Sequence, residues 1–100
     1  QSHAERASLL HIAARAGQSE VVAALIQAGA HVNTRDSAGR TPLYEAAERG
    51  FAGIVRDLMS AGAAPLAADH NRQTPLLRAA LNKHTDIVRL LGHSDRTAAS

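Results

Sequence analysis

The chain has 100 residues, which corresponds to one domain, and its formal net charge at pH 7 is +2. Hydrophobic residues make up 45% of it, alanine is the commonest, and the aromatics reduce to Tyr44 and Phe51, so helices are favoured over a β-sandwich. The absence of cysteine excludes disulfides and thiolate metal sites, and no apolar run approaches the roughly 20 residues of a membrane helix.

The distribution of charge says little about a partner. The sequence pI is about 9.9, but Arg and Lys are scattered among Glu and Asp, and few aromatics could stack on bases. We therefore expect neither a nucleic-acid nor a membrane partner. The chain begins at Gln1 with no visible signal peptide. We expect a soluble protein, intracellular by default, with a periplasmic or secreted location left open.

The chain repeats itself at an interval of 33 residues. Leu10 matches Leu43 and Leu76, and Leu25 matches Leu58 and Leu91. The pair Ala13–Ala14 recurs as Ala46–Ala47 and again as Ala79–Ala80. Val21 and Val22 likewise match Ile54 and Val55, and Ile87 and Val88. Chance does not keep one offset at so many positions, so the repeat is an architectural unit.

Each unit predicts two short helices, and the second helix is clearest in the first unit. It is expected over residues 19–27, with Val22, Leu25 and Ile26 on one face and Gly29 at its end. Gly62 is expected to end the equivalent helix of the next unit. The polar segment RDSAGR, residues 35–40, follows the first unit and is typical of a connecting loop.

The first helix of the second and third units carries its own start signal. Thr41 and Thr74 are good N-cap residues, and the prolines that follow them suit the first helical position, where no amide donor is missed. Gly50 is expected to end the helix in the left-handed conformation. Because isolated helices under about 12–15 residues are marginal, each pair of helices must bury its apolar face against the next pair.

At this level of detail the chain resembles the ankyrin repeat family. The segments TPLYEAAERG (41–50) and TPLLRAALNK (74–83) carry the family signature, and SLLHIAARAG (8–17) carries it with Ser8 and Leu9 in place of Thr-Pro and His11 at the family's histidine. The resemblance covers about residues 3–92 and implies an all-α solenoid of stacked helix–turn–helix pairs, joined by β-turn or hairpin-like loops. It divides the single domain into a leading loop (1–7), two repeats (8–40 and 41–73), a partial or capping repeat (74–92) and a polar tail (93–100).

Two residues depart from the family pattern. Lys83 stands where Gly17 and Gly50 stand, at a position expected to be left-handed, unless Asn82 shifts the helix end by one residue. Arg72 stands where the preceding loop has Gly39. Of a capping repeat and a truncated one, we favour a capping repeat at the C-terminal end.

No catalytic motif is present: there is no phosphate-binding glycine loop, no His-Glu-x-x-His and no Gly-x-Ser-x-Gly. The six histidines show no i, i+4 pairing on a helix. We expect His11 to hydrogen-bond within its own repeat and the other five to be solvated. The sequence therefore predicts no enzyme, no metal site and no cofactor.

The carboxylates of the second repeat have a structural interpretation. Glu45 and Glu48 are predicted to lie on a solvated helix face, with Glu48 near Arg49. Glu45 and Arg78 occupy equivalent positions one repeat apart, so they are expected to face each other as a surface ion pair.

The resemblance further implies a concave binding face made of the loop tips and the exposed side of each first helix. These are the positions at which the repeats differ while the framework stays constant. The predicted protein-binding residues are Arg15, Arg35, Ser37, Ala38, Arg40, Tyr44, Glu48, Arg49, His70, Asn71, Gln73, Leu81 and Asn82.

Two of these residues have a second interpretation. Tyr44 is either a contact for a partner or a ring packed against neighbouring loops. Leu81 is either a hydrophobic contact or a scattered exposed leucine.

We interpret the chain as a non-catalytic protein-interaction module, an adaptor or scaffold that binds one protein partner as a monomer. The alternatives are a small stand-alone inhibitor or immunity-type protein that blocks an enzyme, for instance with the loop tip 35–40, and the interaction segment of a larger multidomain protein.

Overall fold

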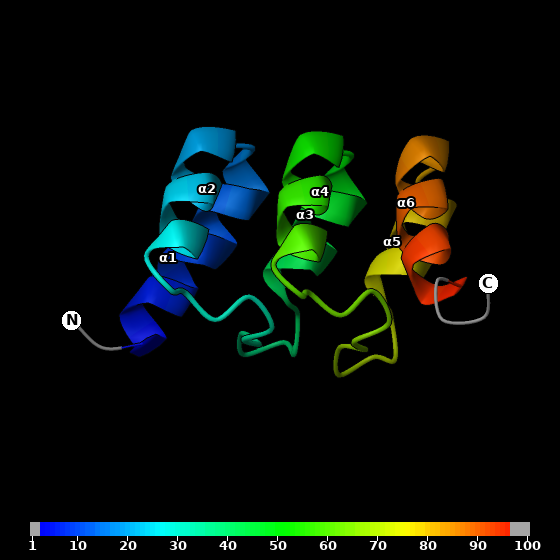
Figure 1. Cartoon of the computed structure of the whole chain (residues 1–100). Coiled ribbons are helices and arrows are strands. Elements are labelled where there is room, and N and C mark those ends of the chain that lie inside the picture. Colours follow the sequence, from blue (N-terminus) through cyan, green and yellow to red (C-terminus); the bar gives the residue numbers. More distant parts are fainter. Residues whose placement is uncertain (1–2, 97–100) are drawn as a thin grey trace.

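The computed structural model describes residues 3–96 of the chain, and side chains from residue 9 to residue 92. The described part contains six helices and no strand (Figure 1). In chain order the helices are α1 (His3–Ala16), α2 (Ser19–Gln27), α3 (Pro42–Arg49), α4 (Ala52–Ser60), α5 (Pro75–Leu81) and α6 (Thr85–Arg96). The predicted all-α class is thereby confirmed.

The helices form three antiparallel pairs that stack side by side in two layers (Figure 1). In one layer α3 contacts α1 and α5, and in the other α4 contacts α2 and α6. The stack is elongated, with principal extents of 39, 27 and 23 Å. Long loops leave the stack together on one side, between α2 and α3 and between α4 and α5.

The helix boundaries follow from local chemistry, as the sequence predicted. The Thr41 Oγ1 accepts a hydrogen bond from the Tyr44 N–H at 3.2 Å, and the Thr74 Oγ1 accepts one from the Leu77 N–H at 3.0 Å. A proline occupies the first turn of both helices. Gly50 ends α3 with a φ of 85°, the left-handed conformation in which a side chain would be strained.

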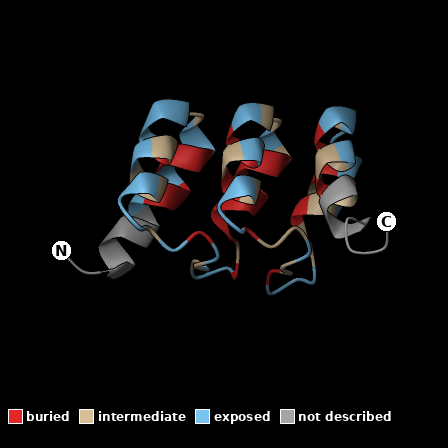
Figure 2. Ribbon diagram, in the orientation of Figure 1, coloured by how far each residue is buried: buried red, intermediate tan, exposed pale blue. Residues whose placement is uncertain are grey.

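The core lies between the two layers, where Figure 2 shows most of the buried residues. Leu10 and Leu43, one repeat apart, are both fully buried, as are Ala46 and Ala47 of α3. Because alanine side chains are small, they allow the first helices of neighbouring repeats to approach closely. Leu58 and Leu91 then fill the space under the second helices and are equally buried.

The two ends of the stack differ from the prediction. Helix α1 begins at His3, so residues 3–7 are helical and not a leading loop. No Thr-Pro pair restarts the helix at Ser8, and alanine, glutamate and arginine at positions 4–7 are all good helix formers. Helix α6 continues to Arg96, so the predicted polar tail is helical over residues 93–96. Residues 97–100 lie outside the described part.

Each loop is closed by an aspartate, and the two loops are built alike. The Asp36 N–H donates to the Arg40 carbonyl oxygen at 2.9 Å, while the Asp36 Oδ1 accepts the N–H groups of Ala38 and Arg40. Asp69 makes the equivalent contacts in the next loop. The His70 N–H donates to the Ala38 carbonyl oxygen at 3.0 Å, so neighbouring loops are bonded to each other.

Candidate protein-binding face

The exposed sides of α1, α3 and α5, together with the loops of residues 28–41 and 61–74, form one surface, called here the first-helix face. Twelve of the thirteen predicted binding residues have exposed or half-buried side chains on or beside it, the exception being Tyr44. Leu81, at 57% exposure, ends α5, and Asn82 follows it as the C-cap.

A chain of ion pairs crosses the first-helix face from the first repeat to the third. The Glu45 carboxylate accepts from Arg15 Nη2 of α1 at 3.3 Å and from Arg49 Nη1 at 2.7 Å. The Glu48 carboxylate lies 3.4 Å from Arg49 Nη1 and accepts from both Nε and Nη2 of Arg78 in α5. The network therefore couples α1, α3 and α5 through two carboxylates of the middle helix.

This network corrects two expectations about the carboxylates. Glu45 is not solvated, because its side chain is 1% exposed. Its partners are Arg15 and Arg49, whereas Arg78 pairs with Glu48. At both junctions a residue at the position of Glu45 or Arg78 reaches the residue at the position of Arg15 or Glu48 in the preceding helix, three positions further along than the equivalent residue. The proximity of Glu48 and Arg49 is confirmed.

Tyr44 belongs to a second cluster, at the junction of α3 with the loops. Its side chain is buried, it hydrogen-bonds to Asp69, and the Arg40 guanidinium lies over its ring, 5.1 Å from the centroid. The Asp69 Oδ2 lies 3.9 Å from Arg40 Nε. Of the two interpretations of Tyr44, the structure supports packing within the stack, so its ring is not an accessible contact for a partner.

The protonation states in this cluster follow from its hydrogen bonds. Burial alone would raise the pKa of Asp69, but the N–H groups of Gln73 and Asn71, the Tyr44 hydroxyl and the Arg40 guanidinium all favour the carboxylate, and its pKa lies below the ordinary value. Burial raises the pKa of Tyr44, and the Asp69 charge raises it further. At neutral pH the neutral hydroxyl thus donates to an ionised carboxylate.

One histidine fits the prediction and another does not. The Nε2–H of His11 donates to the carbonyl oxygen of Arg40, the last residue of its own repeat, at 2.8 Å, as expected. His84 is half-buried and bonds the Glu48 carbonyl oxygen at 3.0 Å, so it is not merely solvated. His31 and His70 are exposed. The side chains of His3 and His93 lie outside the described residues.

The loop residues of the predicted set are presented on a bonded framework. Ser37, Ala38, His70 and Asn71 are exposed, and Ala38 and Asn71 occupy equivalent positions in the two loops. Arg35 is exposed too, and its Nη1 donates to the Ala68 carbonyl oxygen of the next loop. This bond ties Arg35 to the next loop, so its side chain does not project freely as the inhibitor alternative would require.

The predicted binding set leaves out three residues that organise this surface: Asp69, and Glu45 and Arg78, which were expected only to pair with each other. A signal for Asp69 was available, because Asp36 and Asp69 stand 33 residues apart at the same place in their loops. Glu45 and Arg78 occupy one position of the repeat, and its equivalent in the first repeat is Ile12, so the residue at this position does not recur. Its actual partners therefore carried no comparable signal.

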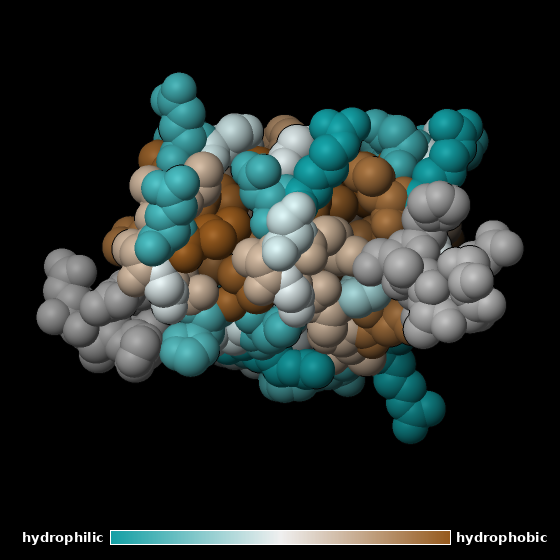
Figure 3. All heavy atoms as spheres, in the orientation of Figure 1, coloured by the Kyte–Doolittle hydropathy of each residue, from teal (hydrophilic) through white to brown (hydrophobic). Residues whose placement is uncertain are grey.

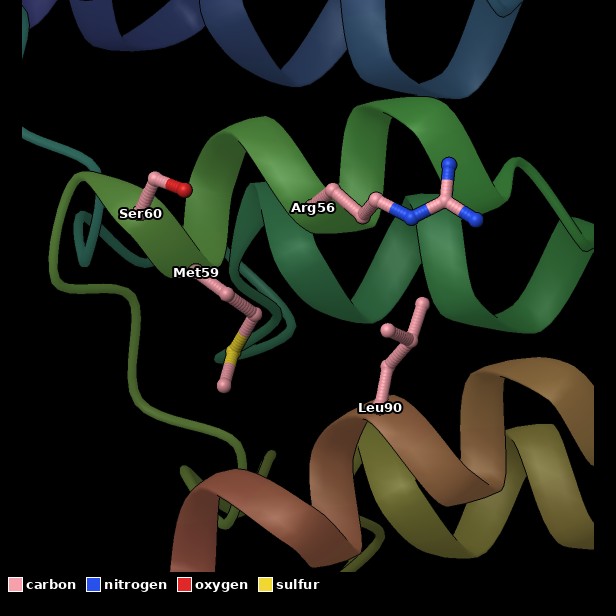
Figure 4. Close-up of a pocket in the computed structure, with 4 residues that line it drawn as sticks. All are labelled: Arg56, Met59, Ser60 and Leu90. Atoms are coloured by element: carbon pink, nitrogen blue, oxygen red, sulfur yellow. The ribbon is translucent and has the colours of Figure 1, made fainter. Parts of the chain in front are cut away.

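The opposite side of the molecule, formed by α2, α4 and α6, has a different character. Hydrophobic residues come to its surface between neighbouring helix pairs (Figure 3). Between α4 and α6 there is a hollow of about 310 Å³ lined by Arg56, Met59, Ser60 and Leu90, with Met59 and Leu90 reaching toward each other's helix (Figure 4). Among the described residues that line it, Arg56 carries the charge.

Within the described residues, no three His, Cys, Asp or Glu side chains come together as metal ligands would. In the same part of the chain no helix has the length and hydrophobicity needed to cross a bilayer.

Residues 10–98 match the family described as ankyrin repeats, in three copies. The chain therefore belongs to the ankyrin repeat family, and the stacked helix pairs and aspartate-closed loops described above are its fold. Proteins of this family generally mediate protein–protein interaction and are typically non-catalytic. No curated protein matches the chain.

Proposed function

We propose that this protein is a non-catalytic interaction module that binds a protein partner on its first-helix face. The observation that carries the proposal is the contrast within the repeat. Positions that recur, such as Leu43, Ala46 and Ala47, are fully buried, whereas positions that vary between the loops, such as Ala38 and Asn71, are exposed. The framework is constant and the variable side chains face outward.

The rigidity of the face supports the same function. Loop-to-loop hydrogen bonds and the ion pairs from Arg15 through Glu45 and Glu48 to Arg78 hold its groups in place before any partner arrives. A surface that is already ordered loses little conformational entropy on docking. Ankyrin repeats generally mediate protein–protein interaction, and this surface is the one on which the chain's own variable residues gather.

The proposal is tested by blocking the face with bulky neutral side chains. Ala38→Trp and Asn71→Trp together place an indole on each loop without changing charge. Lysate from the native host is passed over immobilised wild-type chain and over this variant, and bound proteins are identified by mass spectrometry. We expect at least one protein to bind the wild type and to be lost from the variant.

A matched control carries Gln27→Trp and Ser60→Trp, which are equivalent, exposed positions at the ends of α2 and α4 on the opposite side. This control should retain the partner. Loss of the partner from the control with retention by the loop variant would place the binding site on the second helices instead and overturn the proposal.

A further inference from the structure

The charges of the first-helix face are separated by depth. Its described side chains include six arginines and four carboxylates. The arginines are Arg15, Arg35, Arg40, Arg49, Arg72 and Arg78, and the carboxylates are Asp36, Glu45, Glu48 and Asp69. The side chains of Arg15, Arg40 and Arg49 are 45%, 37% and 37% exposed, whereas those of Glu45 and Asp69 are 1% and 2% exposed. A partner approaching this face meets guanidinium groups first.

The carboxylates are also engaged by donors within the fold. Both oxygens of Glu45 accept from arginines, and both oxygens of Glu48 have arginine partners. Asp69 accepts from two backbone N–H groups at 2.8 Å and from the Tyr44 hydroxyl. Asp36 accepts from two backbone N–H groups of its own loop. A basic partner would therefore compete with donors that the fold already supplies.

Arg40 is held in this face without a close carboxylate partner. Its guanidinium is held over the Tyr44 ring and lies 3.9 Å from Asp69, a distance too long for a hydrogen bond. Its Nε is buried and has no hydrogen-bond partner among the described residues. The guanidinium is therefore fixed in position, and the Arg40 side chain is 37% exposed. Guanidinium groups bind carboxylates through two parallel hydrogen bonds, so the exposed part of this side chain is suited to a carboxylate of a partner.

We infer that the partner presents an extended, acidic segment to the first-helix face, with carboxylate side chains bound by the arginines of all three repeats. This inference rests on the proposed function and names the chemistry of its partner. Arg15 and Arg49 lie on the helices and Arg40 and Arg72 on the loops, so basic groups follow the stack along its length. An extended peptide of about twelve residues spans the 39 Å of the long axis.

The test uses a synthetic peptide of alternating glutamate and serine, about twelve residues long. Its amide twin has glutamine at every glutamate position, and a single-stranded oligothymidylate supplies the same charge as phosphate. Binding to the full chain is measured by calorimetry at about 0.01 M ionic strength, where screening is weak. We expect the glutamate peptide to bind, the glutamine peptide not to bind, and the affinity of the glutamate peptide to fall steeply with added salt.

Two matched double variants locate the binding. Arg40→Gln with Arg72→Gln removes two charges from the loops, and Arg56→Gln with Arg89→Gln removes two exposed charges from α4 and α6. The loop variant should weaken binding of the glutamate peptide about tenfold, and the second-helix variant less than about twofold. The salt dependence of wild-type binding gives a readout that does not depend on the folding of either variant.

Three outcomes overturn the inference: no binding of the glutamate peptide at low salt, equal weakening by both double variants, or tighter binding of the oligothymidylate at the same arginines, which would assign the face to phosphate. The proposed function has its own readout. If a captured partner is lost from the tryptophan variant of the loops but kept by the loop Arg→Gln variant, the face binds protein and the acidic partner is wrong.

Discussion

Lys83 has a φ of 63°, a conformation that glycine occupies in the other two repeats, at Gly17 and Gly50. Asn82 has an ordinary φ of −93°, so it does not take over the left-handed position, and the left-handed conformation predicted for Lys83 is confirmed. A Cβ built at Gly50 would lie 2.8 Å from the His84 ring of the next repeat, so glycine there is required by both conformation and space. At Lys83 only the backbone conformation disfavours a side chain.

Replacing Lys83 with glycine should therefore stabilise the protein. The left-handed conformation costs a residue with a side chain roughly 1–2 kcal/mol, and the greater freedom of glycine in the unfolded chain offsets part of this gain. We expect Lys83→Gly to raise the free energy of unfolding by about 0.5–1 kcal/mol in urea titrations. Gly50→Lys is the reverse substitution and should destabilise by more. An unchanged midpoint for Lys83→Gly would contradict the strain.

Asp69 makes the stability of the fold depend on pH. Its pKa is lower in the folded protein than in the unfolded chain, so it contributes stability that is present above the unfolded pKa of about 3.9 and is lost as pH falls through the folded pKa. Asp69→Asn keeps the acceptor geometry but removes the charge. We expect the variant to be less stable at pH 7 by about 1–2 kcal/mol.

The difference between wild type and Asp69→Asn should shrink below about pH 4, as the wild-type carboxylate takes up its proton. Urea midpoints of the two proteins at pH 7, 5 and 3 measure it. A difference that stays constant from pH 7 to pH 3 would mean that the ionised form of Asp69 is not the stabilising one.

At the scale of elements, α3 is the centre of the stack, because it contacts both α1 and α5 and carries the two carboxylates of the ion-pair network. Removing one partner of a fully buried ion pair costs about 3–5 kcal/mol, and of an exposed pair about 0–1 kcal/mol. Glu45 is buried, but Arg15 and Arg49 remain partly exposed, so the loss falls between these limits.

We accordingly expect Glu45→Gln to lower the free energy of unfolding by about 1–2 kcal/mol, because two guanidinium groups lose their shared counter-charge. Glu20→Gln on α2 is the control, since Glu20 is exposed, and its effect should stay within about 0.5 kcal/mol. Equal urea midpoints for the two variants would show that Glu45 is no more than a surface charge.

At the scale of the whole molecule, stability is distributed along the stack. Each repeat contacts only its neighbours, so the middle repeat takes part in both interfaces and the third in one. Leu58 and Leu91 stand at equivalent positions of these two repeats, and both are fully buried. Substituting each leucine therefore removes the same buried side chain and changes only its position in the stack.

Leu58→Ala and Leu91→Ala should each cost about 2–5 kcal/mol of local packing. Tyr44 is the only tyrosine and the chain has no tryptophan, so its fluorescence reports on the middle repeat alone, while circular dichroism reports on all helices. In Leu58→Ala we expect both signals to move together to lower urea. In Leu91→Ala the dichroism should begin to change before the fluorescence does. Coincident curves in both variants would instead indicate fully cooperative unfolding.

Much of the fold could be predicted because its signals are local. Thr41 and Pro42 start a helix and Gly50 ends it through their own backbone preferences, wherever the helix packs. The N-terminal part of α1 was missed because the family alignment suggested a loop, whereas the helix propensity of residues 4–7 prevailed. Most of the candidate face could be named from variability alone, but not the burial of Tyr44 or Glu45.

The sequence by itself determined the period, the helix boundaries inside the stack and most of the inward-facing residues, since each depends on side chains a few positions apart or on a fixed 33-residue offset. Only the tertiary structure decided which charge meets which. Glu45 pairs with Arg15, 30 residues away, and His11 bonds a carbonyl group 29 residues away. These partners belong to different helices and loops, so their meeting depends on how the elements pack in three dimensions and not on spacing along the chain.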